Sequence, residues 1–178
     1  MVVSVAIAST AEKKNNSSNA DIGGNDVAQD GGTQQEESDS DGEEIAFGQE
    51  GTIDDGLTLI VNEVTETDKI SAVNGMMSYK PKSGKYAVIN VTIRNNSKKS
   101  KSLLLNYFNM VDSDDARYVA SIVAAADDKF ITVDTINPNL DITGNLVFEI
   151  PNELSAQDCT LRYSDYQIFS QTSYFKLK

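Results

Sequence analysis

The chain has 178 residues, of which 39% are hydrophobic, and a formal net charge of −12. This length allows one domain of ordinary size with a tail. The negative charge excludes a nucleic-acid-binding protein, because such binding relies on cations that displace counterions from phosphates. The chain has no histidine and one cysteine, which excludes imidazole catalysis, an internal disulfide and a cysteine metal cluster. We therefore expect no cofactor.

Residues 1–10, with the sequence MVVSVAIAST, are apolar and small. They are too short to span a bilayer, which needs about 20 apolar residues, and they lack the positive n-region of a signal peptide. Two interpretations remain: the residual end of an export signal or membrane anchor, or an unrelated flexible end. The polar tract that follows favours the first. An N-terminal anchor is then the expected contact with a membrane.

Residues 11–46 have the composition of a disordered acidic linker. Met1 to Glu50 contains 11 acidic and 2 basic residues, whereas Gly51 to Lys178 contains 16 acidic and 13 basic ones. All 13 Phe and Tyr residues lie at or beyond Phe47. A segment without large rings buries too little apolar surface to offset the entropy of its chain. We expect residues 11–46 to act as a flexible spacer, extended by charge repulsion.

From Phe47 the sequence changes to short apolar alternations separated by turn residues. Period-two patterns predict half-buried antiparallel strands, and the three longest cover Leu57–Val64, Lys85–Arg94 and Ile142–Ile150. The residues expected to face inward are Leu57, Leu59, Val61, Ala87, Ile89, Val91, Ile93, Ile142, Leu146, Phe148 and Ile150, and those expected to face outward are Asn90, Thr92 and Arg94. Gly144 in the third strand suggests a bulge or a close backbone approach.

Shorter patterns complete the expected set of strands. They cover Leu103–Leu105, Phe108–Val111, Tyr118–Ile122, Thr160–Tyr163 and Tyr174–Leu177, and none of the three prolines falls inside a proposed strand. Seven or eight short strands in about 130 residues indicate an all-β, two-sheet antiparallel sandwich. We expect residues 47–178 to form this immunoglobulin-like domain. Cys159, at the start of a strand, is expected to pack in the core as a small hydrophobic residue.

Three blocks of the sequence carry a resemblance to a known family. They are Phe47–Gly48 leading into Leu57–Val61, then Gly84–Asn95, and last Ile136–Pro151. The chain resembles the immunoglobulin-like domains of unknown function found in Gram-positive envelope lipoproteins and membrane-tethered surface proteins. The resemblance implies a fold akin to that of the mycobacterial immunoprotective secreted antigen. It carries over no catalytic or binding residue, and the lipobox cysteine or membrane helix usual upstream in that family is not seen here.

The densest group of carboxylates in the expected domain is Asp112, Asp114 and Asp115, in a turn between two strands. Three carboxylates on one tight loop repel each other, and a divalent cation would relieve the repulsion. Asp is also a preferred turn residue for its own hydrogen bonds. The turn role is the first interpretation. A weak calcium site at these three residues is the second.

The sequence supplies no set of residues for catalysis, so we expect a protein that is not an enzyme. The leading hypothesis is a non-catalytic extracellular binding or adhesion module of the bacterial cell envelope, secreted or anchored through its stalk. Its partner would be an envelope protein or polymer. The alternative is a structural or accessory protein that stabilises a membrane or surface complex. An exposed aromatic patch of Tyr163, Tyr166 and Phe169 would favour binding.

Overall fold

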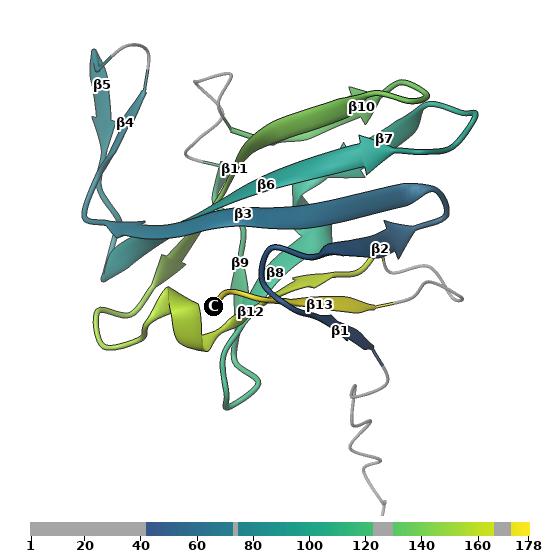
Figure 1. The fold of residues 1–178 in the computed structure, drawn as a ribbon. Helices are drawn as coiled ribbons and strands as arrows, with labels where there is room; N and C mark the ends of the chain where they lie inside the picture. Colours follow the sequence, from purple (N-terminus) through teal and green to yellow (C-terminus); the bar gives the residue numbers. More distant parts are fainter. Residues whose placement is uncertain (1–41, 73–74, 123–129, 166–171) are drawn as a thin grey trace, which may run out of the picture. The chain divides into compact units, whose positions relative to one another are not determined.

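A computed structural model describes residues 42–72, 75–122, 130–165 and 172–178 (Figure 1). The terminal segment 1–10 and the linker up to residue 41 lie outside the described residues. The described chain is built from strands, together with the short 3-10 helices η1 (Leu105–Tyr107) and η3 (Ala156–Asp158). Within these ranges, no helix is long and apolar enough to cross a membrane. The all-β fold class expected from the sequence is confirmed.

The four-stranded sheet has the order β11-β6-β3-β2, and all of its pairs are antiparallel. Its strands are β2 (Glu50–Asp54), β3 (Leu57–Thr67), β6 (Lys85–Asn95) and β11 (Asp141–Ile150). The alternation in the sequence sets which face is buried. The side chains at 87, 89, 91 and 93 of β6 are fully buried, whereas Arg94 is exposed and Asn90 and Thr92 are intermediate. The register expected for this strand is confirmed.

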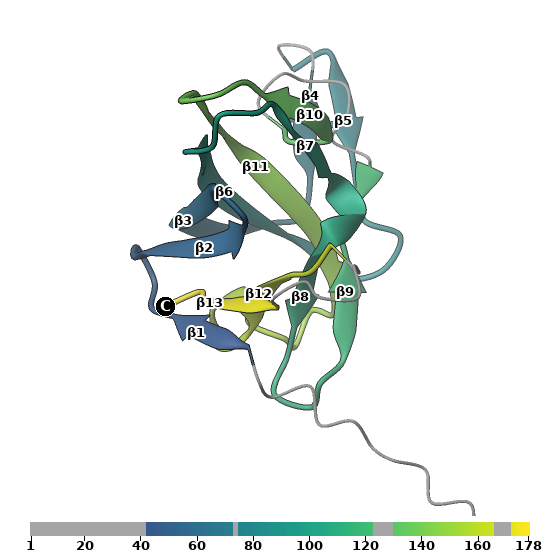
Figure 2. The ribbon, with the colours of Figure 1, turned by 90° about the vertical axis from the view of Figure 1, so that its right-hand side faces the viewer.

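The five-stranded sheet has the order β1-β13-β12-β8-β9. Its strands are β1 (Glu43–Ile45), β8 (Phe108–Val111), β9 (Arg117–Val119), β12 (Thr160–Tyr163) and β13 (Ser173–Lys176). The β1–β13 pair is parallel, and the other pairs are antiparallel. Figure 2 shows this sheet as a second layer facing the four-stranded sheet. The two-sheet sandwich is therefore confirmed.

Two further strand pairs stand outside the main sheets. Strand β7 (Lys101–Leu104) pairs with β10 (Val133–Ile136), and β4 (Ile70–Ala72) pairs with β5 (Met77–Tyr79). The β4–β5 pair connects β3 to β6 as a hairpin that extends away from the sandwich (Figure 1). This hairpin was not expected from the sequence.

The core lies between the two sheets and is dominated by aliphatic side chains and a few rings. Fully buried examples are Ile89 and Phe148 from the four-stranded sheet, and Phe108, Leu161 and Phe175 from the five-stranded sheet. Tyr163 also belongs to this core, with its ring 5.2 Å from that of Phe108 in an edge-to-face arrangement. Such pairs add stabilisation beyond the area that they bury.

Two sequence predictions about the backbone need correction. The expected domain starts at Phe47, but the first strand, β1, lies upstream of that residue and pairs with β13. Ile45 of β1 is buried in the core. A strand of three residues is too short to give a periodic signal in the sequence. The bulge suggested at Gly144 is wrong, because the β6–β11 ladder passes Gly144 without a shift. The register shifts lie instead at Val61/Glu63 in β3 and at Thr52/Asp54 in β2.

Gly84 closes the turn that leads into β6, and its position admits no side chain. Its φ is +91°, and a Cβ atom there would lie 2.1 Å from the carbonyl oxygen of Ile150. We expect Gly84→Ala to lower the free energy of unfolding by about 2 kcal/mol or more in urea melts, through the clash and the unfavourable φ. Gly48→Ala is the control, because Gly48 also has a positive φ, of +74°, but no atom lies within 4 Å of its Cβ position. This variant therefore has the unfavourable φ without the clash. Equal losses at both sites would contradict this account.

Candidate functional site

Cys159 packs in the core and has no features of a nucleophile. Its side chain is buried, and the thiol donates a hydrogen bond to the carbonyl oxygen of Ser155 at 3.5 Å. Burial, assisted by the negative charges of Asp112 and Asp158, raises the pKa of the Cys159 thiol to about 11. The thiolate is the reactive form, so this thiol is inert near neutral pH. The core role expected for Cys159 is confirmed.

The structure places Asp112 at the end of β8 as the organiser of the β8–β9 turn. Its Oδ1 accepts hydrogen bonds from the backbone N–H groups of Asp114 and Ala116, both at 2.9 Å, and its Oδ2 accepts one from the Tyr118 hydroxyl at 2.9 Å. Asp115 takes the left-handed conformation that such turns require, with φ of 60°. The geometry thus supports the turn role of this carboxylate.

The same geometry does not gather Asp112, Asp114 and Asp115 into a ligand set. Among the residues that the structure describes, no three His, Cys, Asp or Glu side chains lie close enough together to hold a metal ion. The lone pairs of Asp112 already accept hydrogen bonds from the turn and from Tyr118. The weak calcium site considered from the sequence is not supported by this arrangement.

The role of Asp112 in the turn predicts a pH-dependent contribution to stability. Desolvation raises the pKa of Asp112, but its three hydrogen bonds outweigh this, and the net pKa lies below the ordinary value of 3.8. The contribution is therefore present above that value and is lost as pH falls through the lowered pKa of the folded state. We expect wild type to lose more stability than Asp112→Asn between about pH 6 and about pH 2. Asp114→Asn is the control, because it removes a carboxylate from the same turn. If Asp112→Asn loses as much stability as wild type over this pH range, Asp112 does not make this contribution.

Of the three residues of the aromatic patch considered from the sequence, the structure describes Tyr163, and it places this ring in the core. Tyr163 is 2% exposed and packs against Phe108 and Tyr107, so it cannot serve as a surface ring. Tyr166 and Phe169 lie outside the described residues. Burial raises the pKa of the Tyr163 hydroxyl well above its ordinary range, in keeping with a core position.

The outward face of the four-stranded sheet carries a network of amides and hydroxyls. Asn62, at the bulge of β3, donates to Asn90 Oδ1 at 2.9 Å and to Thr92 Oγ1 at 3.0 Å. Asn90 in turn donates to Asn145 Oδ1 at 2.8 Å, and the hydroxyls of Thr92 and Thr143 lie 2.8 Å apart. These hydrogen bonds connect side chains across three strands and stabilise the register of the sheet.

At one end of this outer face, a small apolar cluster anchors the β4–β5 hairpin. The cluster contains Ile70 from β4, Tyr86 and Val88 from β6, Val147 from β11, and Phe130. Ile70 is 5% exposed, and its partner in the hairpin register is Tyr79. The first residue of β4 is therefore held on the sheet, while the remainder of the hairpin extends beyond it (Figure 1).

The tip of the hairpin carries the most exposed large apolar residue of the described chain, Met76. We call residues 70–79 the hairpin arm; of these, 73 and 74 lie outside the described residues. Met76 is 85% exposed and Met77 is 45% exposed. The Tyr79 hydroxyl donates to the Met77 sulfur at 3.6 Å, which links the ring to the tip. Gly75, with φ of +84°, supplies the turn. The arm thus presents flexible thioether side chains to solvent.

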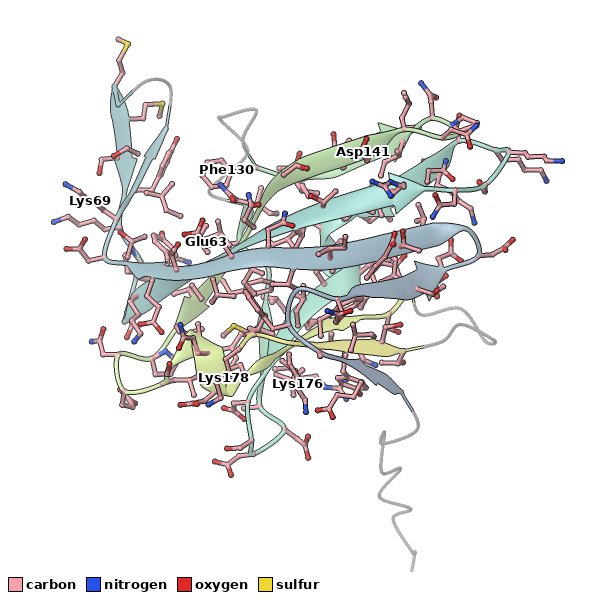
Figure 3. All side chains as sticks on the ribbon, viewed as in Figure 1. Glu63, Lys69, Phe130, Asp141, Lys176 and Lys178 are labelled. Carbon is pink, nitrogen blue, oxygen red and sulfur yellow. The ribbon has the colours of Figure 1, made fainter. Side chains whose placement is uncertain are left out.

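Lysines flank the base of the arm. Lys69 immediately precedes β4, as Figure 3 shows, and Lys80 and Lys82 follow β5; all three are exposed. Within the described chain, none of the three forms an ion pair. By contrast, Lys85 forms an ion pair with Glu66 at 2.5 Å. The hydrogen bond from Lys85 lowers the pKa of Glu66, whereas desolvation raises it. With the further hydrogen bond from the N–H of Ala156, the net pKa of Glu66 lies below its ordinary value. Lys82 lines a pocket with Glu149 and Glu153, so Lys69 and Lys80 are the lysines that adjoin the two strands of the arm.

Sequence reasoning missed the arm, although a signal for it was present. Asn74-Gly75 is a strong hairpin-turn dipeptide, and it lies between the short runs Ile70–Val73 and Met76–Tyr79. Both runs are too short for a clear period-two pattern.

Comparisons with solved structures show the same fold in several bacterial proteins. The YjhA protein from Bacillus subtilis is 20% identical, with a TM-score of 0.59, and the match covers 75% of this chain and 99% of that one. The secreted protein MPT63 from Mycobacterium tuberculosis is 17% identical, with a TM-score of 0.51 and coverage of 76% and 98%. A candidate lipoprotein from Bacillus subtilis, YcdA, is 18% identical, with a TM-score of 0.50 and coverage of 71% and 37%.

None of the curated proteins matches the chain. A family model does match, and it covers the sandwich from β1 into β13. Its description is "Domain of unknown function (DUF4352)", and the match runs over residues 45–174. The resemblance found in the sequence is thereby confirmed, and this chain belongs to the DUF4352 family.

Proposed function

We propose that this chain is a non-catalytic binding module that acts outside the cell, at the bacterial cell envelope, and that the hairpin arm is its contact surface. The N-terminal segment would tether the domain through a flexible stalk. The absence of histidine and the inert buried thiol of Cys159 support a role without catalysis. Among proteins of the same fold, one is described as secreted and another as a candidate lipoprotein, which supports a location outside the cell.

The exposure of Met76 and Met77 is the observation that carries the proposal. Burying a methionine side chain fully is worth about 1.5–3 kcal/mol, and the fold leaves this stabilisation unused at the tip of the arm. The strands of the arm pair with each other and with neither main sheet. Methionine adapts its shape to irregular partners, which is why it is common on surfaces that bind. A contact surface explains the arm better than a role in folding.

The test is co-sedimentation of the full chain with washed envelopes of a Gram-positive bacterium. We expect wild type to be retained, and the double variant Met76→Ser, Met77→Ser to lose most of its retention. The control variant Leu140→Ser removes another exposed apolar side chain, which is 54% exposed and lies outside the arm. It should be retained like wild type. The proposal would be contradicted if wild type did not sediment with the envelopes. It would also be contradicted if wild type, the double variant and Leu140→Ser sedimented with them equally well.

A further inference from the structure

We infer that the ligand of the hairpin arm is an anionic lipid surface, into which the methionine tip inserts while the flanking lysines contact the headgroups. This inference rests on the proposed function, because it names the partner of the same arm. It draws on three features of the described chain: the exposed thioethers, the lysines Lys69 and Lys80 that adjoin the arm, and the projection of the hairpin from the sandwich.

The arm has the dimensions of an interfacial anchor. A strand rises about 3.3 Å per residue, so the tip at Met76 lies about 10 Å beyond Tyr79 along the arm. Interfacial segments bury their apolar groups about 5–10 Å into the boundary between headgroups and acyl chains. Lys80 follows Tyr79 directly and Lys69 precedes Ile70 directly, whereas Lys82 lies two residues beyond Lys80. With the tip inserted, the long cationic side chains of Lys69 and Lys80 reach the headgroup level.

The charge distribution favours an anionic surface at this site. The segment from Asp68 to Lys82 contains three lysines and one acidic residue, whereas Gly51 to Lys178 as a whole contains 16 acidic and 13 basic residues. Charges separated by more than the Debye length, about 8 Å at physiological ionic strength, are largely screened from each other. Because the arm extends away from the sandwich, Lys69 and Lys80 are the cations that it presents to an anionic surface, whereas Lys82 lines a pocket together with Glu149 and Glu153.

The size of the tip favours a lipid surface over a folded protein. A stable protein interface buries about 800 Å² on each partner, far more than the side chains of Met76 and Met77 supply. Insertion into a bilayer requires no matching surface, because the lipid closes around the side chains. The apolar cluster of the outer sheet face holds Ile70, at the base of the arm, in place, so the base does not have to be ordered on binding.

The test is flotation of the full chain with vesicles of equal parts phosphatidylglycerol and phosphatidylcholine, compared with phosphatidylcholine alone. We expect binding to the anionic vesicles at about 0.15 M salt and its loss at about 0.5 M salt. Each lysine near an anionic surface contributes about fivefold in affinity, so Lys69→Gln with Lys80→Gln should weaken binding about 25-fold. Met76→Ser with Met77→Ser should weaken it about tenfold or more.

Matched controls lie outside the arm. Lys98→Gln with Lys99→Gln removes two exposed lysines from the loop after β6, and Leu140→Ser removes an exposed apolar side chain. Both should bind within about twofold of wild type, because surface changes away from a contact have small effects. Equal binding to both kinds of vesicle, or equal losses in arm and control variants, would overturn the inference.

The two proposals fail in distinguishable ways. If the chain ignores anionic vesicles but its retention on envelopes still depends on Met76 and Met77, the lipid inference is wrong and the arm binds a protein or a wall polymer. If retention on envelopes does not depend on the arm either, the proposed function is also wrong. Arm-dependent binding in both assays supports both.

Discussion

Ile89→Asp is expected to lower the free energy of unfolding by about 3 kcal/mol or more, which is a large part of the stability of an ordinary domain. Ile89 is 0% exposed at the centre of the four-stranded sheet, with Leu146 of β11 and Val64 of β3 as its partners in the ladders. The new carboxylate would enter the core without a polar partner. Urea denaturation of both proteins, with comparison of midpoints and slopes, measures the difference.

The neighbouring residue provides the control for this prediction. Asn90 faces the other side of β6, where its amide bonds to Asn62 and Asn145. Asn90→Asp places its charge at a partly exposed site, and the amide of Asn145 can turn to donate to the new carboxylate. We expect a cost below about 1 kcal/mol. Losses of similar size at Ile89 and Asn90 would mean that the buried face of β6 is misassigned.

Asn95→Leu is expected to cost about 3 kcal/mol, although it makes the side chain more hydrophobic. Asn95 is 0% exposed, and its Nδ2 donates to the carbonyl oxygens of Lys99 at 2.7 Å and Ile136 at 2.8 Å. Its Oδ1 accepts from the backbone N–H and the hydroxyl of Ser97, at 2.9 and 2.7 Å. Leucine would leave these groups without their partner, and each unsatisfied buried group costs about 1–3 kcal/mol.

The adjacent amide again serves as the matched control. Asn96 is exposed, and its side chain donates one hydrogen bond of 3.2 Å to Thr58 Oγ1. We expect Asn96→Leu to change the unfolding free energy by no more than about 0.5 kcal/mol. Thermal melts of both variants make the comparison. If Asn95→Leu proves as mild as Asn96→Leu, the hydrogen bonds of Asn95 do not organise this end of the sandwich.

The long strands could be predicted from the sequence because their burial is one-sided over many residues. In β6, four successive inward positions are fully buried, from Ala87 to Ile93, and alternation of that length has no helical alternative. Strands β1, β4 and β5 have three residues each. Their existence depends on partners that lie elsewhere in the chain, such as β13 for β1. A period of two cannot be recognised in three residues.

The candidate site was harder to predict than the fold, for two physical reasons. The sequence shows which residues are charged or aromatic but not which are exposed. Tyr163 therefore seemed a surface ring, although β12 directs it into the core. For Asp112 the sequence left a turn role and a weak calcium site both open, and only the structure shows that the turn uses its oxygens. Met76 and Met77 gave no signal in the sequence, because methionines usually pack in cores. Their exposure is seen only in the structure.

Excision of the hairpin arm tests the central claim most directly. Ile70 and Tyr79 are partners in the β4–β5 ladder, so the eight residues between them can be replaced by Asn-Gly, the preferred two-residue hairpin turn. Ile70 keeps its place in the apolar cluster of the outer face. We predict that the shortened chain melts within a few degrees of wild type and is no longer retained on bacterial envelopes. A folded, shortened chain that is retained as well as wild type would contradict the claim that the arm is the contact surface.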